Sequence, residues 1–445
     1  MSTPALVSLV HLGCARNLID SELILGRMAE EGLGVTTDQD DAHTVVLNTC
    51  SFIGPARTES ENAIRDLVER KREGRISGIV VAGCLVQRYR RKLREDFPEV
   101  DSFAEISDYS ELAKQVRRLV DGERIPAYLE GPVARAADRE GARMLATPGS
   151  YSYLRISHGC DHQCSFCTIP SIRGAHRSKT IESLVSEAEE LSSNGVRELV
   201  LVAEDSTAWG RDIGLELPDL MSALGDVEAL RRIRLMYAYP NRFPWGLTEL
   251  LRDHPKIVPY LDIPVQHFAT PVLRAMRRAG SGDQVRAILD RLRTEVPDIT
   301  LRTTVLVGFP GETEADFEEL LTNIREYRIG RLGAFPYCPE DSTPSFELEG
   351  RLPQELIEER VTRVLEVRDE VLLAEQKALI GRDFEILIDE PQAGPDAPLV
   401  GRAEMDAPEA DLLSLVYDSE ARVGEFVQVR VEDVDSQANL LCRAT

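Results

Sequence analysis

The sequence has no apolar run that approaches the ~18 residues of a membrane-spanning helix. Its first residues, MSTPALVSLVHLGC, lack the basic leader and cleavage site of a signal peptide. Solenoid repeats and low-complexity tracts are also absent. These absences predict a cytoplasmic protein without membrane association. Hydrophobic residues make up 43% of the 445 positions, so packed cores are expected, in about three domains.

Positive charge is scarce as well. Lys and Arg total 52 against 76 Asp and Glu, which gives a net charge of −24 at pH 7. Residues 376–445 carry six basic and fifteen acidic side chains, a net charge of −9, in runs such as EMDAPEAD and VEDVD. An acidic surface repels the phosphates of nucleic acid and attracts basic partners. We therefore expect a basic protein partner rather than tRNA. The alternative is an acidic surface that serves only solubility.

Strand and helix patterns alternate through most of the chain. Residues 1–140 contain the apolar runs ALVSLVHLG, HTVVLNT and ISGIVVAG between helical stretches, which predicts an α/β domain with a doubly wound parallel sheet. Residues 141–375 contain six more strand candidates: YSYLRIS, RELVLVAE, RIRLMYAY, YLDIPVQ, TLRTTVLVGF and RLGAFPYC. Six such units predict a partial (β/α)6 TIM-like barrel, because eight units need roughly 250 residues.

Local signals add detail to this organisation. Thr313 and Asp316 predict a helix that begins with a capping box, and Gly195 is expected just after the end of another helix. In residues 376–445 the period changes to two, as in FEILIDE and FVQVRVEDV. That period predicts a small antiparallel, OB-like β-barrel as the third domain.

Three cysteines, Cys160, Cys164 and Cys167, lie within the eight residues CDHQCSFC. Such clustering in a cytoplasmic protein indicates metal binding or catalysis more than disulfides. One interpretation is a structural zinc site with His158 or His162 as the fourth ligand. The other is a four-iron cluster, which normally takes four thiolates, so that three leave one iron open. The segment follows a strand directly, where (β/α) barrels carry their catalytic loops, and this favours the cluster.

A second set of three cysteines is dispersed through the first domain. Cys14, Cys50 and Cys84 each follow a strand, in VHLGC, VLNTC and VVAGC. A lone cysteine is most often a small buried hydrophobe. Parallel strands, however, end at a shared edge where ligands bind. We therefore predict that these thiols meet and hold a second cluster with an open iron. Cys338 and Cys442 receive no role.

The CxxxCxxC segment after the first strand of a partial barrel resembles the signature of radical S-adenosylmethionine (SAM) enzymes. With the dispersed cysteines and a terminal barrel of the TRAM type, the whole chain resembles the methylthiotransferases. Within that family it is similar to the RimO branch in LGCARNLIDSE, NTCSFIGPA, AGCLVQRY, CSFCTIPSIRGAHRS, YLDIPVQH, VGFPGETEADF and GRAEMDAPEAD. The resemblance implies a methylthiotransferase N-terminal domain, a radical SAM core and a TRAM domain.

The resemblance also implies a function. Enzymes of this branch add a methylthio group to the β-carbon of an aspartate in ribosomal protein twelve of the small subunit, free or on the ribosome. The implied cofactors are two [4Fe-4S] clusters and SAM, with an electron donor such as flavodoxin or ferredoxin. One cluster starts the radical chemistry and the other carries the sulfur that SAM methylates. No base could deprotonate the target carbon, so no catalytic acid or base is assigned.

Three further residues are candidates for binding SAM by the same resemblance. Phe166, just before the last cysteine, is expected beside the adenine. Glu204, in Ala203-Glu204-Asp205 at the end of the second barrel strand, is expected to bind the amino group of the methionine moiety. Gln266, at the end of YLDIPVQ, is a third candidate. For Glu204 and Gln266 the alternative is a hydrogen bond to the backbone at a loop end.

Two other functions stay open on the residues alone. The first is methylthiolation of adenosine in tRNA, which the acidic terminal barrel counts against. The second is a zinc-bearing, ribosome-associated binding protein without turnover.

Overall fold

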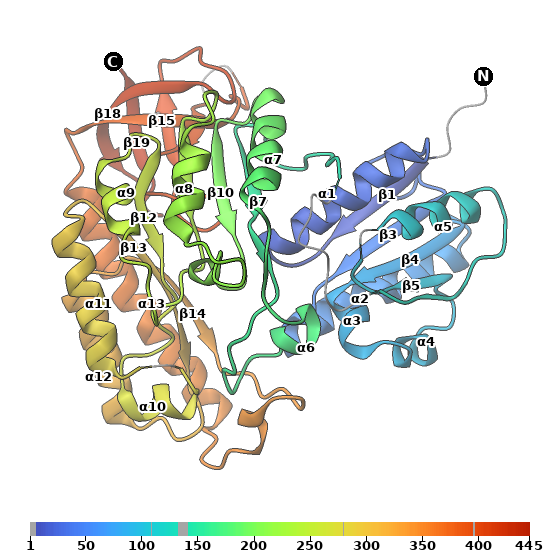
Figure 1. Ribbon diagram of the computed structural model, residues 1–445, viewed down its shortest axis with the longest axis horizontal. Coiled ribbons are helices and arrows are strands. Elements are labelled where there is room, and N and C mark those ends of the chain that lie inside the picture. Colours follow the sequence, from blue (N-terminus) through green and yellow to red (C-terminus); the bar gives the residue numbers. More distant parts are fainter. Residues whose placement is uncertain (1–5, 108, 132–140, 279, 395–396) are drawn as a thin grey trace. The chain divides into compact units, whose positions relative to one another are not determined.

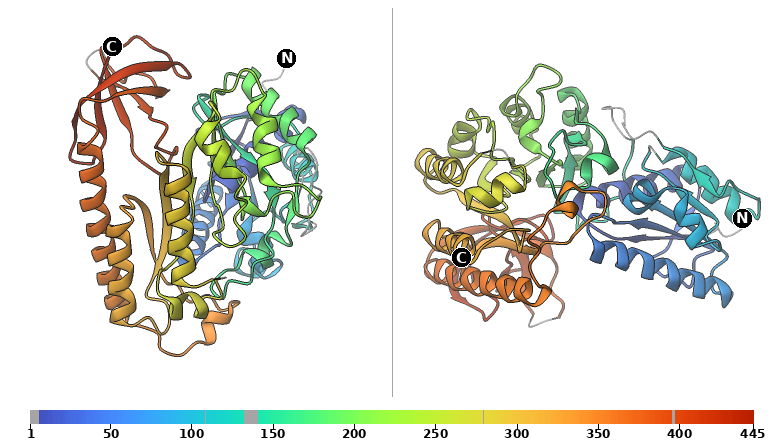
Figure 2. Two further views of the ribbon diagram at one scale, coloured as in Figure 1. Left: turned by 60° about the vertical axis from the view of Figure 1, so that its left-hand side comes forward. Right: turned by 90° about the horizontal axis from the view of Figure 1, so that it is seen from below.

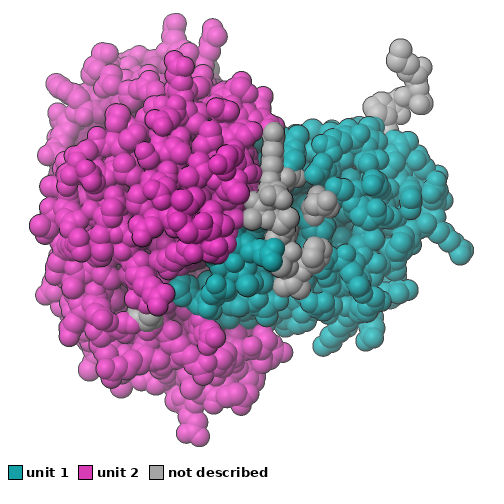
Figure 3. All heavy atoms as spheres, in the orientation of Figure 1, with its two compact units in different colours: residues 1–146, 158–162, 167–177 teal, residues 147–157, 163–166, 178–445 magenta. Residues whose placement is uncertain are grey.

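The computed structural model describes residues 6–107, 109–131, 141–278, 280–394 and 397–445 (Figure 1). The chain forms two compact units, coloured separately in Figure 3. The first comprises residues 1–146, 158–162 and 167–177, and the second comprises residues 147–157, 163–166 and 178–445. The division into three domains near residues 140 and 375 remains a prediction. In the part of the chain that is described, no helix has both the length and the apolar character needed to cross a bilayer.

The first unit contains a six-stranded parallel sheet in the order β2-β1-β3-β4-β5-β6. Its strands are β1 (Leu6–His11), β2 (Gly34–Val35), β3 (Thr44–Thr49), β4 (Gly78–Gly83), β5 (Ser102–Ala104) and β6 (Tyr128–Leu129). Every residue of the central β3 and β4 is buried, which explains their continuous apolar runs. The strands predicted from sequence are β1, β3 and β4. The other three are too short to give a pattern.

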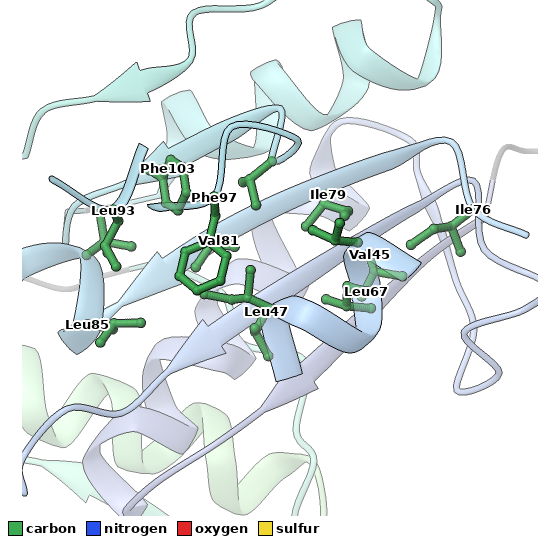
Figure 4. Close-up of a cluster of buried hydrophobic side chains, with 14 of the residues drawn as sticks. Val45, Leu47, Leu67, Ile76, Ile79, Val81, Leu85, Leu93, Phe97 and Phe103 are labelled. Atoms are coloured by element: carbon green, nitrogen blue, oxygen red, sulfur yellow. The ribbon is translucent and has the colours of Figure 1, made fainter. Parts of the chain in front are cut away.

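Helices cover both faces of this sheet. They are α1 (Ala15–Glu30), α2 (Gly54–Arg72), α3 (Cys84–Tyr89), α4 (Lys92–Asp96), α5 (Ser110–Val120) and the returning α6 (Ile169–Arg173). Side chains of α2 and α3 pack on alternate residues of β3 and β4, such as Val45, Leu47, Ile79 and Val81 (Figure 4). The helices α1 and α5 contact each other and the sheet. The predicted doubly wound α/β fold is therefore confirmed.

The second unit contains an open, six-stranded parallel sheet in the order β14-β13-β12-β11-β10-β7. Its strands are β7 (Tyr151–Arg155), β10 (Glu198–Val202), β11 (Arg232–Leu235), β12 (Ile257–Asp262), β13 (Thr300–Val307) and β14 (Arg331–Pro336). They correspond to the six strands predicted from sequence, except that β12 begins three residues before YLDIPVQ and ends at Asp262. The short strands β8 (Ser157–His158) and β9 (Arg177–Ser178) flank the cysteine segment.

Helices line the outer side of the open sheet (Figures 1 and 2). They are α7 (Ile181–Ser193), α8 (Leu217–Gly225), α9 (Leu247–Asp253), α10 (Thr270–Ala275), α11 (Gly282–Glu295), α12 (Glu314–Glu326) and α13 (Gln354–Lys377), with 3-10 turns at η1 (Ser206–Ala208) and η2 (Pro344–Glu347). As predicted, Thr313 and Asp316 cap α12 reciprocally, and Gly195 follows α7 with a positive φ of 103°.

Helix α13 leads into a closed five-stranded barrel in the same unit (Figure 2). Its strands are β15 (Asp383–Glu390), β16 (Leu399–Arg402), β17 (Ser414–Tyr417), β18 (Phe426–Val434) and β19 (Leu440–Ala444). The predicted barrel is thus present, with one difference: β17 and β19 pair in parallel, because β19 enters the barrel between β17 and β18. Cys442 lies in its apolar core as an ordinary side chain.

The acidic segment 402–411 contacts side chains of β7, β12 and β14 within the second unit. Asp406 and Asp411 have side chains that are 1% and 2% exposed. The bonds are Arg331 to Asp406 at 2.8 Å, Tyr260 to Asp411 at 2.6 Å, and Tyr151 and Tyr153 to Glu409 at 3.1 and 3.0 Å. EMDAPEAD therefore closes one end of the partial barrel.

This placement corrects part of the expectation that the acidic residues of 376–445 attract a basic partner. Asp406, Glu409 and Asp411 were expected to attract a basic partner, but they satisfy arginine and tyrosine side chains of their own chain. The buried carboxylates of Asp406 and Asp411 need such partners, so the charge of these two residues does not report on recognition. In VEDVD, by contrast, Glu432 and Asp433 on β18 are exposed.

Candidate functional site

The three dispersed cysteines lie at the carboxyl ends of neighbouring strands in the first unit. Cys14 follows β1, Cys50 follows β3 and Cys84 follows β4, and these strands are adjacent and parallel. A β-carbon at Gly13 would lie 3.2 Å from the sulfur of Cys50, so the first two cysteine loops touch. Gly13 has a φ of 111°, a conformation that L side chains rarely adopt. The structure thus brings the three loops to one edge of the sheet.

The thiols influence one another's ionisation. Burial raises the pKa of Cys84 to about 11 against the opposing charge of Arg173, and Cys14 and Cys50 add to the rise. Burial also acts on Cys14, but the charges of Arg16 and Arg173 outweigh it and lower the pKa of this thiol. The charge of Arg173 thus favours the thiolate form of both Cys14 and Cys84, and the thiolate is the form that binds iron.

The first turns of α1 hold these loops in place. Asn17 donates from Nδ2 to the carbonyl oxygens of Leu12 at 2.6 Å and Thr49 at 3.2 Å. Asn48, at the end of β3, donates from its own Nδ2 to the carbonyl of Asn17 at 2.9 Å and to Oγ of Ser21 at 2.8 Å. These hydrogen bonds satisfy the buried side chains of Asn17 and Ser21. Asn17 bonds to Leu12 and Thr49, which lie beside Cys14 and Cys50, and Asn48 bonds to Asn17.

Sequence reasoning missed Arg173, which lies at the same edge. Its guanidinium donates to Oδ2 of Asp20 at 2.7 Å and to Sγ of Cys84 at 3.2 Å. Arg173 stands six residues after Cys167, in SIRGAHRS, far in sequence from the cysteine it contacts. No pattern of spacing links the two segments, so only the fold could identify this contact.

The second set of cysteines lies in the loop region between β7 and α6. Cys160 and Cys167 belong to the first unit and Cys164 to the second. Cys160 donates its backbone N–H to the carbonyl of Gly174 at 3.0 Å. In the second unit, Nη1 of Arg278 lies 3.8 Å from Sγ of Cys164. That this set forms one ligand group remains a prediction.

Hydrogen bonds fix the centre of this loop. Ser165 donates from its backbone N to the carbonyl of Met276 at 2.9 Å and from Oγ to the carbonyl of Ala275 at 2.8 Å. Its own carbonyl accepts from the backbone N of Ser345 at 2.8 Å. Cys164 is therefore held by the end of α10 and by η2.

The three predicted SAM-binding residues all lie in the second unit. Phe166 is half-buried and makes an edge contact with Phe309, with ring centroids 6.4 Å apart. Glu204 follows β10, and within the described part of the chain its buried Oε2 has no hydrogen-bond partner. Gln266 follows β12 with a positive φ of 69°, and its backbone is bonded to Thr304 and Leu306.

Two of these positions have features that are compatible with a bound ligand. An unpartnered, buried carboxylate oxygen is costly unless a bound molecule completes it. A left-handed conformation at a residue other than glycine stores strain, and such strain clusters at functional sites. Glu204 and Gln266 follow β10 and β12 at the carboxyl ends of the strands, where (β/α) barrels carry their active sites.

A mononuclear metal site is not formed by the residues that the structure describes. Among them, no three His, Cys, Asp or Glu side chains converge as one metal ion would require. A four-iron cluster poses a different requirement, because each of its thiolates binds a different iron.

Solved structures with a similar fold are radical SAM enzymes. The methyltransferase TsrM from Kitasatospora setae is 16% identical, with a TM-score of 0.56 and coverage of 77% of each chain. The cobalamin-dependent enzyme OxsB is 14% identical, with a TM-score of 0.50 over 82% of this chain and 56% of that one. At these identities the likeness shows the fold alone.

Three family models match separate segments of the chain. Residues 7–105 match the uncharacterized protein family UPF0004, residues 154–324 match the radical SAM superfamily, and residues 380–438 match the TRAM domain.

Relatives of known name match almost the whole chain. The ribosomal protein uS12 methylthiotransferase RimO of Anaeromyxobacter sp. is 41% identical over 95% of this chain and 90% of its own. Those of Pelobacter propionicus and Geobacter sulfurreducens are each 38% identical over 96% of this chain and at least 95% of theirs. The predicted resemblance is therefore confirmed: this chain belongs to the RimO family of radical SAM methylthiotransferases.

Proposed function

We propose that this protein adds a methylthio group to the β-carbon of an aspartate in ribosomal protein uS12. One observation carries the proposal: two separate cysteine sets follow strands of two parallel sheets, in a chain that matches uS12 methylthiotransferases over 96% of its length. The enzyme is a transferase that uses SAM and two [4Fe-4S] clusters, as its family does. Because the substrate is a ribosomal protein, we expect it to work in the cytoplasm.

Each cysteine set has its own role in this proposal. Cys160, Cys164 and Cys167 hold the cluster that, when bound, supplies the electron for cleavage of SAM to methionine and a 5′-deoxyadenosyl radical. Cys14, Cys50 and Cys84 hold the second cluster, which supplies the sulfur. The polar scaffold of Asn17 and Asn48 supports this assignment, because its hydrogen bonds fix the cysteine loops of the first unit.

Glu204, Gln266 and Phe166 are proposed to hold SAM. The buried Oε2 of Glu204 would accept a hydrogen bond from the ammonium group of the methionine moiety. A carboxylate that pairs with an ammonium makes a stronger bond than a neutral acceptor does. Phe166 offers a half-buried ring that is fixed by Phe309, which suits stacking beside a purine.

The tRNA alternative is distinguished by its product. Ribosomal proteins and tRNA are isolated from cells with and without the gene, and both are analysed by mass spectrometry. We expect a methylthio group on an aspartate-containing peptide of uS12, present only with the gene. A gene-dependent methylthioadenosine in tRNA, with unmodified uS12, overturns the proposal. Flavodoxin or ferredoxin as the electron donor is a proposal that reconstitution with each purified protein tests.

A further inference from the structure

Arg173 is a buried cation at the cysteine edge of the first unit's sheet. Its Nη1 donates to Oδ2 of Asp20 at 2.7 Å, and its Nη2 lies 3.2 Å from Sγ of Cys84 and 3.4 Å from Oδ1 of Asn17. Arg173 is 7% exposed and Asp20 is fully buried. A guanidinium stays charged and holds its N–H groups in one plane. Asp20 therefore fixes the direction in which Arg173 points at the sulfur.

The short helix that carries Arg173 is docked on the same loops. Ile172 packs against Cys84 and Ile106 in a small apolar cluster. Thr168 donates from Oγ1 to the carbonyl of Phe52 at 3.3 Å, two residues after Cys50. All of these residues belong to the first unit. The position of the guanidinium thus results from packing on both sides and not from a single flexible side chain.

We propose that Arg173 is a positioning residue of the cluster held by Cys14, Cys50 and Cys84. It orients the Cys84 thiolate through an N–H···S hydrogen bond and places a positive charge beside the cluster. Hydrogen bonds to sulfur and local charge set the reduction potentials of iron–sulfur clusters. Both favour the more negative, reduced state, so Arg173 raises the potential of this cluster. The inference rests on the proposed function for the presence of the cluster there.

The chain offers a matched control two residues along α1. Arg143 and Glu22 form another buried ion pair in the first unit, with Nε to Oε2 at 3.0 Å and side chains that are 4% and 0% exposed. This pair resembles that of Arg173 and Asp20 in burial and chemistry. Its loss should weaken the fold to a similar degree, while the N–H···S bond to Cys84 remains.

The experiment uses the full chain with Cys160, Cys164 and Cys167 replaced by Ala, so that one cluster remains. The paired variant D20N/R173M removes the Arg173 contact without leaving a buried charge, and E22Q/R143M is its control. After anaerobic reconstitution, iron is counted and the reduction potential is measured by titration with electron paramagnetic resonance detection. We expect D20N/R173M to lower the equilibrium constant for reduction at least tenfold, which is 59 mV for a one-electron couple. The control should keep the parent's potential.

The alternative outcomes distinguish a failure of the role of Arg173 from a failure of the proposed cluster. An unchanged potential in D20N/R173M, or an equal shift in E22Q/R143M, overturns the role of Arg173. A parent protein that binds no iron overturns the proposed cluster itself. R173K keeps the positive charge but has a different set of N–H donors. If the paired variant does not fold, the reduction potential of R173K tests the hydrogen bond to Cys84 instead. A lowered potential in R173K supports the hydrogen bond to sulfur, and an unchanged one contradicts it.

Discussion

Arg331, the first residue of β14, and Asp406, 75 positions later, form a buried ion pair with a 2.8 Å contact in the second unit. The pair joins strand β14 of the open sheet to the segment between β16 and β17. Removal of one partner leaves the other charged and buried, which typically costs about 3–5 kcal/mol.

Asp406→Ala should therefore lower the free energy of unfolding by about 3–5 kcal/mol, measured by urea denaturation. Glu432→Ala is the control, because its pair with Arg443 is about half exposed and contributes about 0–1 kcal/mol. Equal, small losses in both variants would contradict the closing role of segment 402–411.

Glu198 gives the second unit a defined response to acid. Burial alone raises its pKa, but the charges of Arg234 and Arg402 dominate and lower it to about 2, from an ordinary value of 4.5. The unfolded chain therefore takes up this proton at a higher pH than the folded protein does. The stabilisation from ionised Glu198 is complete above pH 4.5 and is lost as the pH falls towards 2.

E198Q should be less stable than the wild type at neutral pH and should lose less stability between pH 4.5 and 2. Unfolding by urea across that range tests the expectation, because the gap between the two proteins should narrow as the pH falls. Parallel curves for the two proteins would show that Glu198 does not titrate with the lowered pKa.

Replacement of Cys160, Cys164 and Cys167 by Ala should remove about half of the iron, because one of two equal clusters is lost. Formation of 5′-deoxyadenosine should cease. Cys338→Ala is the control and should retain both iron and activity, since Cys338 has no assigned role. Unchanged iron in the triple variant, or zinc in the wild-type protein, would refute this ligand set.

Replacement of Cys14, Cys50 and Cys84 by Ala should separate the two steps. The triple variant should still cleave SAM to 5′-deoxyadenosine, but it should form no methylthiolated uS12, because the second cluster supplies the sulfur. Chromatography of the nucleoside and mass spectrometry of the protein give the two readings. Methylthiolated uS12 from this variant would exclude the proposed sulfur role.

Glu204→Gln should weaken SAM binding about ten- to a hundredfold, since a hydrogen bond to a charged group contributes about 1.5–3 kcal/mol. Equilibrium binding of SAM to the reconstituted enzyme measures this. The neighbouring Asp205 accepts hydrogen bonds from the backbone and the hydroxyl of Thr207, so Asp205→Asn should bind SAM nearly as well as the wild type. If the two variants lose affinity equally, Glu204 is not the ammonium partner.

Much of the fold could be predicted because its strands are long and uniform. β3 and β4 give clear apolar runs, and Thr313 and Asp316 mark the start of α12. The edge strand β2 has two residues, too few for any periodicity. The parallel pairing of β17 with β19 depends on the order of strands in the closed barrel, which a local pattern does not contain.

In the candidate sites, too, local features could be predicted and long-range contacts could not. Candidate cysteines can be recognised by their residue type and by their position after strands, as at Cys14 and Cys84. The partner of a charged side chain cannot be recognised in this way. Asp406 and Glu409 had the composition of an acidic surface, yet their partners come from β14 and β7, far away in the sequence. Arg173 likewise could not be identified from sequence, because the thiol that it contacts, Cys84, lies 89 positions earlier.

The bonds of segment 402–411 to β7, β12 and β14 limit how such an enzyme can be retargeted. A chimaera that received the terminal barrel of another methylthiotransferase would lose those partners and leave Arg331 and three tyrosines, Tyr151, Tyr153 and Tyr260, without their acidic partners. Evolution or engineering can alter the outer strands, such as β18 with Glu432 and Asp433, without that penalty. The terminal barrel is thus a fixed part of the catalytic body that carries a replaceable outer face.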